Sequence, residues 1–221
     1  TVRKAVVLLS GGLDSATCLA LARRQGYDCY ALSFDYGQRH IAELAAAKRI
    51  VESLGARDHK VIKLDLGGLG GSALTDDSLP IPETESEGIP ITYMPARNTM
   101  FLAYALAWAE VLQAAAIFIG VNALDYSGYP DCRDNYIKSK GIELGLGLDR
   151  DVVIHTPLMW LKKKDIFEMA DKNGYLDKMI SMTMTCYNGS DILNEWGMGC
   201  GDCPSCKLRK KGFLIIIPNH L

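Results

Sequence analysis

Two groups of residues in this sequence have types and a spacing that suit chemistry, and the first is Ser10-Gly11-Gly12-Leu13-Asp14-Ser15. Its two glycines let backbone N–H groups approach an anion, and a helix that starts here adds a partial positive charge. The serine hydroxyls can donate to phosphate oxygens, and Asp14 beside a polyphosphate is expected to hold Mg²⁺. The segment therefore predicts a pyrophosphate-binding loop; the alternative is an ordinary glycine turn followed by a helix cap.

The second group is a set of four cysteines near the end of the chain, Cys186, Cys200, Cys203 and Cys206. Thiolates three residues apart in a Gly/Pro knuckle can surround one ion, and an upstream cysteine completes the tetrahedron. Four sulfur ligands leave no open position, so we expect one structural zinc ion whose binding stabilises this part of the chain. An iron–sulfur cluster also uses four thiolates and is the alternative.

The composition is that of a globular protein able to bury a full core, with 48% apolar residues in a chain of 221. No apolar run approaches the ~20 residues needed to span a bilayer, and the first residues lack the pattern of a signal peptide. We therefore expect a cytoplasmic protein with no membrane partner. The formal net charge of −2 argues against a large nucleic-acid-binding surface, which needs clustered Lys and Arg.

Strands and helices that could position these groups alternate along the chain. Short apolar or alternating runs predict strands at 4–9, 28–34, 60–66, 115–121 and 152–155. Helical spacing predicts helices at 15–24, 41–54, 97–113, 135–146 and 161–172. The helix at 97–113 is apolar nearly all round, so we expect it to be buried on every side.

One long connection, residues 67–95, shows no such periodicity. It is rich in glycine and proline and carries an acidic cluster at Glu83, Glu85 and Glu87. A connection of this length is uncommon in a compact domain unless it serves as a lid or binding loop. The alternative is a tolerated disordered insertion.

The alternation predicts an α/β fold with a doubly wound, parallel, five-stranded sheet covered on both faces. Ligands of such folds bind at the carboxyl ends of the strands. The notable polar segments all fall at these ends: 10–15, 35–38, 95–98 and 122–133. We expect an ATP-binding domain at 1–174 and a C-terminal zinc-binding region at 175–221 packed on it.

The loop at 10–15 resembles the Ser-Gly-Gly-x-Asp-Ser signature of the PP-loop ATP pyrophosphatases, which have the adenine-nucleotide alpha-hydrolase-like fold. Those enzymes cut ATP between its α and β phosphates and leave AMP on the substrate. Further segments occur in the same order in one family within that group: 34–40, 95–98, 127–133, 156–159, 185–187 and 200–206. With them, the chain closely resembles the QueC family of the queuosine precursor pathway from about residue 5 to residue 212.

The resemblance implies an ATP-dependent C–N ligase. It would convert 7-carboxy-7-deazaguanine and ammonia to 7-cyano-7-deazaguanine through adenylated acid and amide intermediates. It also implies ATP, Mg²⁺ and one structural Zn²⁺, a homodimer, and no direct contact with nucleic acid. The alternatives are a tRNA-thiolating enzyme with Cys132 as sulfur carrier, an enzyme that joins a deazaguanine to a protein, and a zinc-knuckle binding module without catalysis.

Residue roles follow from the resemblance by position. Catalysis is assigned to Asp14, Ser15, Arg97 and Lys163, because a cation that opens a helix suggests a bound anion nearby; for the lysine, a solvated basic surface is the alternative. Adenine is expected to bind the backbone from Ser33 to Asp35, at the end of the second strand. The ATP-binding stretch comprises Leu9, Ser10, Gly11, Gly12, Leu13, Asp14, Ser15, Ala16, Thr17, Cys18 and Leu19.

The loop that follows residue 122 is expected to recognise the deazaguanine. Its ring edge offers N–H donors that a carboxylate accepts as a pair and an oxygen to which arginine can donate, while a tyrosine can stack. The alternative is a turn with ordinary exposed charges. The residues expected to bind the substrate are Asn98, Asp125, Tyr129, Asp131 and Arg133. Residues 213–221 fit no known pattern and are expected to form either a strand on a dimer partner or a poorly ordered tail.

Overall fold

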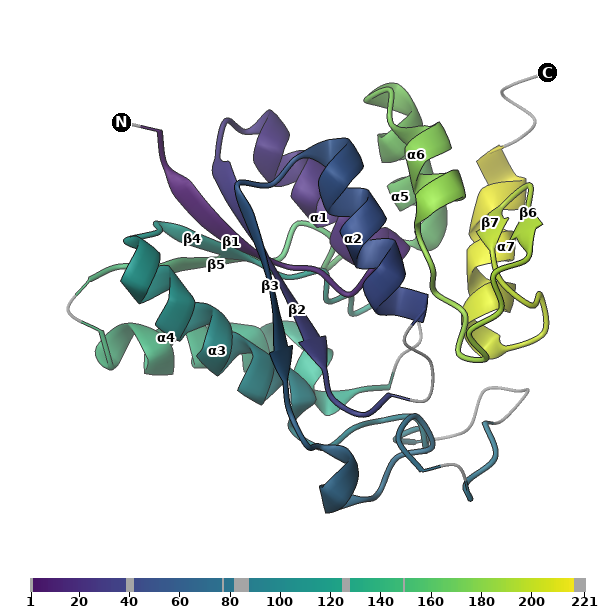
Figure 1. Ribbon diagram of the computed structural model, residues 1–221, viewed down its shortest axis with the longest axis horizontal. Coiled ribbons are helices and arrows are strands. Elements are labelled where there is room, and N and C mark those ends of the chain that lie inside the picture. Colours follow the sequence, from purple (N-terminus) through teal and green to yellow (C-terminus); the bar gives the residue numbers. More distant parts are fainter. Residues whose placement is uncertain are drawn as a thin grey trace.

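The protein forms a single five-stranded parallel sheet with helices on both faces (Figure 1). The computed structural model describes residues 2–38, 42–76, 78–81, 88–124, 128–148 and 150–216. The strands are β1 (Lys4–Leu8), β2 (Asp28–Asp35), β3 (Asp58–Lys63), β4 (Ala116–Phe118) and β5 (Val153–His155). Their order is β3-β2-β1-β4-β5, so the winding reverses between β1 and β4. The predicted fold is confirmed, and this reversal point is where such sheets bind ligands.

Helices cover the two faces of the sheet in separate groups. They are α1 (Leu13–Arg24), α2 (Ala42–Leu54), α3 (Arg97–Leu112), α4 (Asp134–Leu146) and α5 (Lys163–Lys172). In Figure 1, α3 and α4 lie on one side, and α1, α2 and α5 lie on the other. Alternate residues of β1 serve the two cores: Ala5 and Val7 pack toward α1, whereas Val6 and Leu8 pack toward α3. A strand buried on both faces reads as a continuous apolar run, which is why it was recognisable.

Three predictions about these elements are wrong. The strand expected at 115–121 is only β4 (Ala116–Phe118), because Phe118 is the last residue of β4 that pairs with β1 and β5. β3 runs from Asp58 to Lys63 and does not reach residue 66, because its partner β2 ends at Asp35, which pairs with Lys63. Helix α3 is buried on only one face, and its Tyr104 and Val111 are 43% and 80% exposed. The physical reason is that α3 forms a single layer on the sheet, so apolar composition alone did not reveal which face is covered.

The C-terminal part holds elements that the periodicity did not reveal. They are α6 (Leu176–Met182), a small hairpin of β6 (Leu193–Asn194) and β7 (Gly197–Met198), and α7 (Pro204–Ile216). Residues 213–216 are therefore the end of a helix, neither a strand nor a tail. Phe213 contacts Phe167 of α5 with ring centroids 5.5 Å apart, which ties α7 to the main core. Residues 217–221 lie outside the described part.

The connection at 67–95 contains one short helix, η1 (Gly67–Leu69), and otherwise turns. Its acidic cluster at 83–87 lies outside the described residues. A second short helix, η2 (Pro130–Cys132), precedes α4. Among the described residues, the helices are all too short or too polar to cross a membrane.

Candidate active site

The loop at 10–15 joins β1 to α1 and is held by its own serines. The Ser10 N–H donates to Ser15 Oγ at 3.1 Å, and the two hydroxyl oxygens also lie 3.1 Å apart. Gly11 has φ +97°, and a Cβ there would lie 2.1 Å from the Glu43 carbonyl oxygen. Only glycine permits this approach of the loop to α2, and the loop leads directly into the N-terminus of α1, where an anion could bind.

Asp14 and Lys163 form an ion pair at this loop. Lys163 Nζ lies 2.6 Å and 2.8 Å from the two carboxylate oxygens, although the residues are far apart in sequence. Lys163 opens α5, whose first turn is fixed by Asp165 accepting from the Lys162 N–H at 2.8 Å. The geometry places a lysine and an aspartate together where a polyphosphate and its metal ion would need both charges.

A cavity of about 360 Å³ opens beside the loop at the carboxyl ends of β1, β2 and β4. A volume of this order suits a small-molecule site. Its walls come from the sheet, from α3 and from two C-terminal segments. The residues that line it include Leu9, Ser10, Gly12, Asp14, Ser15, Phe34, Tyr36, Glu43, Arg97, Asn98, Phe101, Tyr129, Cys132, Lys163, Thr185, Cys186, Tyr187 and Ser205.

Arg97 extends into this cavity from the start of α3. The preceding Ala96 has φ +56°, a costly conformation for a residue with a Cβ, and it forms the turn from which the helix begins. The guanidinium donates to Tyr36 OH at 3.3 Å and lies 5.8 Å from the Phe101 ring centroid. Burial opposes the charged form, but nearby tyrosine, cysteine and aspartate groups raise the pKa of Arg97, so it is a cation in the cavity.

Part of the loop after residue 122, which was expected to bind the substrate, stabilises the start of α3 instead. Asp131 Oδ2 accepts from the Asn98 N–H at 3.0 Å, so this carboxylate caps α3, and burial raises its pKa. Tyr129 and Asn98 line the cavity, and the Tyr129 hydroxyl hydrogen-bonds to that of Thr92 at 2.8 Å. Asp131 is not among the lining residues, and Arg133 is exposed away from them. Asp125 lies outside the described residues.

The predicted ATP residues also divide into two sets. Leu9, Ser10, Gly12, Asp14 and Ser15 line the cavity. The remaining α1 residues of the prediction are core side chains and do not reach it: Leu13, Ala16, Thr17, Cys18 and Leu19.

The adenine site expected on the backbone around Ser33 to Asp35 stays a prediction, and of these residues Phe34 lines the cavity. Ser33 donates to the Leu9 carbonyl at 2.6 Å, on the opposite side of the strand from the cavity lining, and Asp35 does not line the cavity. Leu32 and Phe34, which alternate with Ser33, face the cavity.

Several lining residues were not predicted from the sequence, and Glu43 is the most polar of them. It lies in the first turn of α2, and its carboxylate faces the cavity. Burial raises its pKa to about 7, with Arg97 opposing the shift. The helix at 41–54 was recognised, but periodicity does not reveal that its first turn faces the end of β2. Tyr36, Thr185 and Tyr187 share this cavity.

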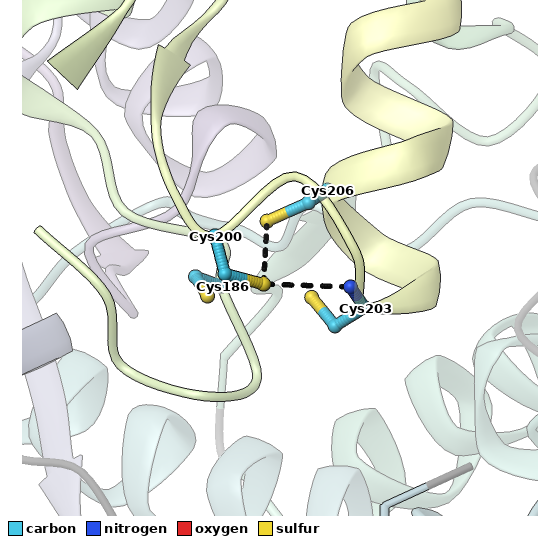
Figure 2. Close-up of side chains that lie close together, drawn as sticks. All are labelled: Cys186, Cys200, Cys203 and Cys206. Atoms are coloured by element: carbon cyan, nitrogen blue, oxygen red, sulfur yellow. Dashed lines mark hydrogen bonds between the residues drawn. The ribbon is translucent and has the colours of Figure 1, made fainter. Parts of the chain in front are cut away.

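The four C-terminal cysteines converge as expected (Figure 2). Their sulfur atoms all lie within 4.8 Å of one another, and those of Cys200 and Cys206 are 4.0 Å apart. A tetrahedral ion with sulfur bonds of about 2.3 Å separates its ligands by roughly 3.8 Å, so the set suits one ion. Hydrogen bonds from Cys203 and Cys206 lower the pKa of Cys186, and the contacts with Cys186 raise the pKa of those two thiols, so the sulfurs share protons as one cluster.

This cysteine cluster is continuous with the cavity wall. The Met184 N–H donates to the Gly11 carbonyl at 2.8 Å, and Cys186 itself lines the cavity. The fully buried Arg209 of α7 fastens the segment by donating to the carbonyls of Trp196 at 2.8 Å and Met179 at 3.0 Å. The C-terminal part therefore supplies one side of the site.

Comparison with known proteins gives a family match over nearly the whole chain. The model of the family described as "Queuosine biosynthesis protein QueC" matches residues 4–216. A 7-cyano-7-deazaguanine synthase of Cellvibrio japonicus is 54% identical over 216 residues, covering 96% of this chain and 93% of the relative. One of Methylobacillus flagellatus is 55% identical over 217 residues, covering 96% and 92%.

Solved structures show the same fold at low identity. A "predicted subunit of tRNA methyltransferase" from Methanocaldococcus jannaschii superposes with a TM-score of 0.51 at 20% identity, over 76% of this chain and 74% of that one. NMN synthetase from Francisella tularensis gives 0.50 at 20% identity, over 80% and 64%. At such identity the likeness concerns the fold alone.

Proposed function

The chain belongs to the QueC family of queuosine biosynthesis proteins, and we propose from this that it converts 7-carboxy-7-deazaguanine, ammonia and ATP to 7-cyano-7-deazaguanine. It is an ATP-dependent enzyme of the ligase type. The observation that carries the assignment is that the loop at 10–15 and the segment at 129–132 meet in one cavity. A nucleotide bound by the loop at 10–15 could therefore react with a substrate bound beside the segment at 129–132 of the same cavity.

The chemistry requires two activations. A carboxylate is a poor electrophile, and transfer of AMP to its oxygen supplies a leaving group that ammonia displaces to form an amide. A second adenylation, on the amide oxygen, lets AMP leave again as the nitrile forms. Both steps place negative charge at the α-phosphate, where preorganised donors stabilise it most.

Residues of this chain divide these tasks. The loop N–H groups and the hydroxyls of Ser10 and Ser15 bind the pyrophosphate, at the positive end of α1. Asp14 would hold Mg²⁺, which neutralises phosphate charge when bound. Lys163, which contacts Asp14, is close enough to donate to a phosphate oxygen. Arg97 faces the same cavity and is suited to the substrate carboxylate.

We also propose that the four cysteines bind a single structural zinc ion, and that residues 175–221 form a zinc region packed on an ATP-binding domain at 1–174. The sulfur separations support one ion, because an iron–sulfur cube holds its four thiolates further apart. A homodimer acting in the cytoplasm, in a tRNA modification pathway but without direct contact with nucleic acid, completes the proposal. The net charge of −2 supports the last point.

The test is incubation with 7-carboxy-7-deazaguanine, ammonium and ATP, with mass detection of the nitrile and chromatography of AMP. The nitrile should form, and Asp14→Ala should abolish AMP release; unchanged AMP release in this variant would contradict the role of the loop. A tRNA-thiolating enzyme is not favoured by the family match. Cys132, buried with its sulfur 3.4 Å from Asn98 Nδ2, should be replaceable by serine with activity retained.

A further inference from the structure

One carboxylate that lines the cavity, that of Glu43, has acceptor oxygens that no described residue uses. Glu43 lies in the first turn of α2, and its backbone carbonyl is in close contact with Gly11 of the loop, so its position relative to the nucleotide is fixed. Within the described part of the chain, the Glu43 carboxylate makes no hydrogen bond or ion pair. A half-buried acid that faces a cavity without a partner is costly unless a ligand supplies one.

The other two acids near this cavity are already engaged. Asp14 is paired with Lys163 through both oxygens. Asp131, which the sequence favoured for reading the substrate, accepts from the Asn98 N–H and does not line the cavity. Among these three carboxylates, Glu43 is therefore the one with two oxygens available to a ligand.

Arg97 complements Glu43 across the same cavity. Its guanidinium donates to Tyr36 and, in the described structure, forms no ion pair with Glu43, although its charge acts on the pKa of that group. Opposite charges that face one cavity without touching leave space for a ligand carrying both donors and acceptors. Aromatic rings of Tyr36, Phe101 and Tyr129 line the space and can pack on a planar ring.

The substrate has the matching pattern of groups. One edge of a deazaguanine presents a ring N–H and an exocyclic amine side by side, which a carboxylate accepts as a pair. The ring oxygen and the 7-carboxyl group lie together on the adjacent side, where an arginine can donate to both. We propose that Glu43 recognises the amino-pyrimidinone edge of the substrate and thereby determines specificity for the 2-amino group. This inference rests on the proposed function.

The variant Glu43→Gln tests this pairing with little change in shape. An amide presents one acceptor and one donor, so one hydrogen bond is lost and an N–H faces an N–H. Loss of a hydrogen bond to a charged group costs roughly a 10- to 100-fold change in affinity. Glu52→Gln, on the exposed side of the same helix, is the matched control.

The experiment measures dissociation constants by calorimetry, without ammonium, for 7-carboxy-7-deazaguanine and for its analogue lacking the 2-amino group. Wild type and Glu52→Gln should prefer the amino compound by roughly 10- to 100-fold, and Glu43→Gln should lose most of that preference while binding ATP normally. Glu43→Ala, which removes the carboxylate altogether, should lose the preference as well, and it serves as the test if the glutamine variant does not fold.

Two outcomes overturn the inference. A Glu43 variant that discriminates between the two compounds as the wild type does shows that another group reads this edge. A variant with unchanged discrimination but a raised KM for ammonium shows that Glu43 acts on ammonia instead. Failure of the wild type to bind 7-carboxy-7-deazaguanine or to form the nitrile is a separate result, and it refutes the proposed function itself.

Discussion

Two regions build the active-site cavity in opposite ways: the loop at 10–15 and the C-terminal segment from α6 to α7. The loop is local, since its hydrogen bonds join residues within one strand–turn–helix unit. The C-terminal segment is held by contacts between distant residues, namely the four cysteines and the carbonyls that Arg209 binds. Both regions meet where Met184 donates to Gly11.

This difference predicts how substitutions should affect the stability of each region. A local unit depends on backbone conformation, so its weakest point is the glycine that no other residue can replace. A region assembled from distant groups depends on the ligands that tie them together, so its weakest points are the metal site and the buried arginine.

Removal of one metal ligand should have the largest effect. Cys203→Ser should lose the metal and lower the stability of the C-terminal segment by several kcal/mol, because the free energy of metal binding also stabilises the fold. Metal analysis and thermal melting measure this. Cys29→Ala, a buried cysteine outside the cluster, should keep its metal. If the metal-free Cys203→Ser variant melted at the same temperature as the wild type, the C-terminal segment would not depend on a bound metal for its stability, and this difference between the two regions would be lost.

Replacement of the buried arginine should come next. Arg209→Met keeps the volume but leaves the carbonyls of Trp196 and Met179 without donors, which should cost about 3 kcal/mol. Urea unfolding measures it, and Lys210→Met, exposed on the same helix, should change stability by less than about 0.5 kcal/mol. Equal effects in the two variants would remove the case for Arg209 as the fastening residue.

Within the local region, Gly11→Ala should be damaging and a second glycine should not. The new Cβ would lie 2.1 Å from the Glu43 carbonyl, so the loop must move, and ATP affinity should fall along with about 2 kcal/mol of stability. Gly26 also has a positive φ, at +81°, but has open space around it. Gly26→Ala should therefore cost about 1 kcal/mol and leave ATP binding unchanged, as measured by nucleotide titration. Equal loss of ATP affinity in both variants would mean that strain alone explains the effect.

The smallest effect concerns Glu43, which lines the cavity between the two regions. The charges of Arg97 and Cys186 both act on its pKa. Its pKa is raised to about 7 in the folded protein from 4.5, so the folded state binds the extra proton and stability falls as the pH rises between these values. Glu43→Gln should remove this slope and be more stable than the wild type at pH 8 without substrate. Denaturation at pH 5 and pH 8 measures it, and a parallel pH dependence of the two proteins would contradict it.

The sequence was sufficient for the parts of the fold whose signals are local. The strand at 4–9 is buried on both faces, and the glycine loop after it is short enough for its chemistry to be read directly. It was insufficient for α3, where composition could not show which face meets the sheet. It also did not predict α6 and α7, whose packing depends on the cysteine cluster and on Arg209 rather than on a clear periodicity.

The site was predicted in the same uneven manner. The cysteine spacing and the loop at 10–15 identified residues that do come together. Asp131 was chosen by residue type, but the structure uses it to cap α3, while Glu43 and Tyr187 face the cavity from segments that carry no motif for it. Tertiary packing decides which acid caps a helix and which one faces the cavity. Residue types and spacing in a single sequence do not predict this.

The hydrogen bond between Met184 and Gly11 also bears on how the protein is made. A ribosome delivers the loop at 10–15 long before it delivers the cavity wall at 184–208, and domains fold as their segments emerge. The early strands can pair while α7 is still inside the ribosome, but the pocket is open on one side at that stage. We therefore expect a growing chain of this protein to bind ATP well only after α7 has left the ribosome and has packed beside the loop.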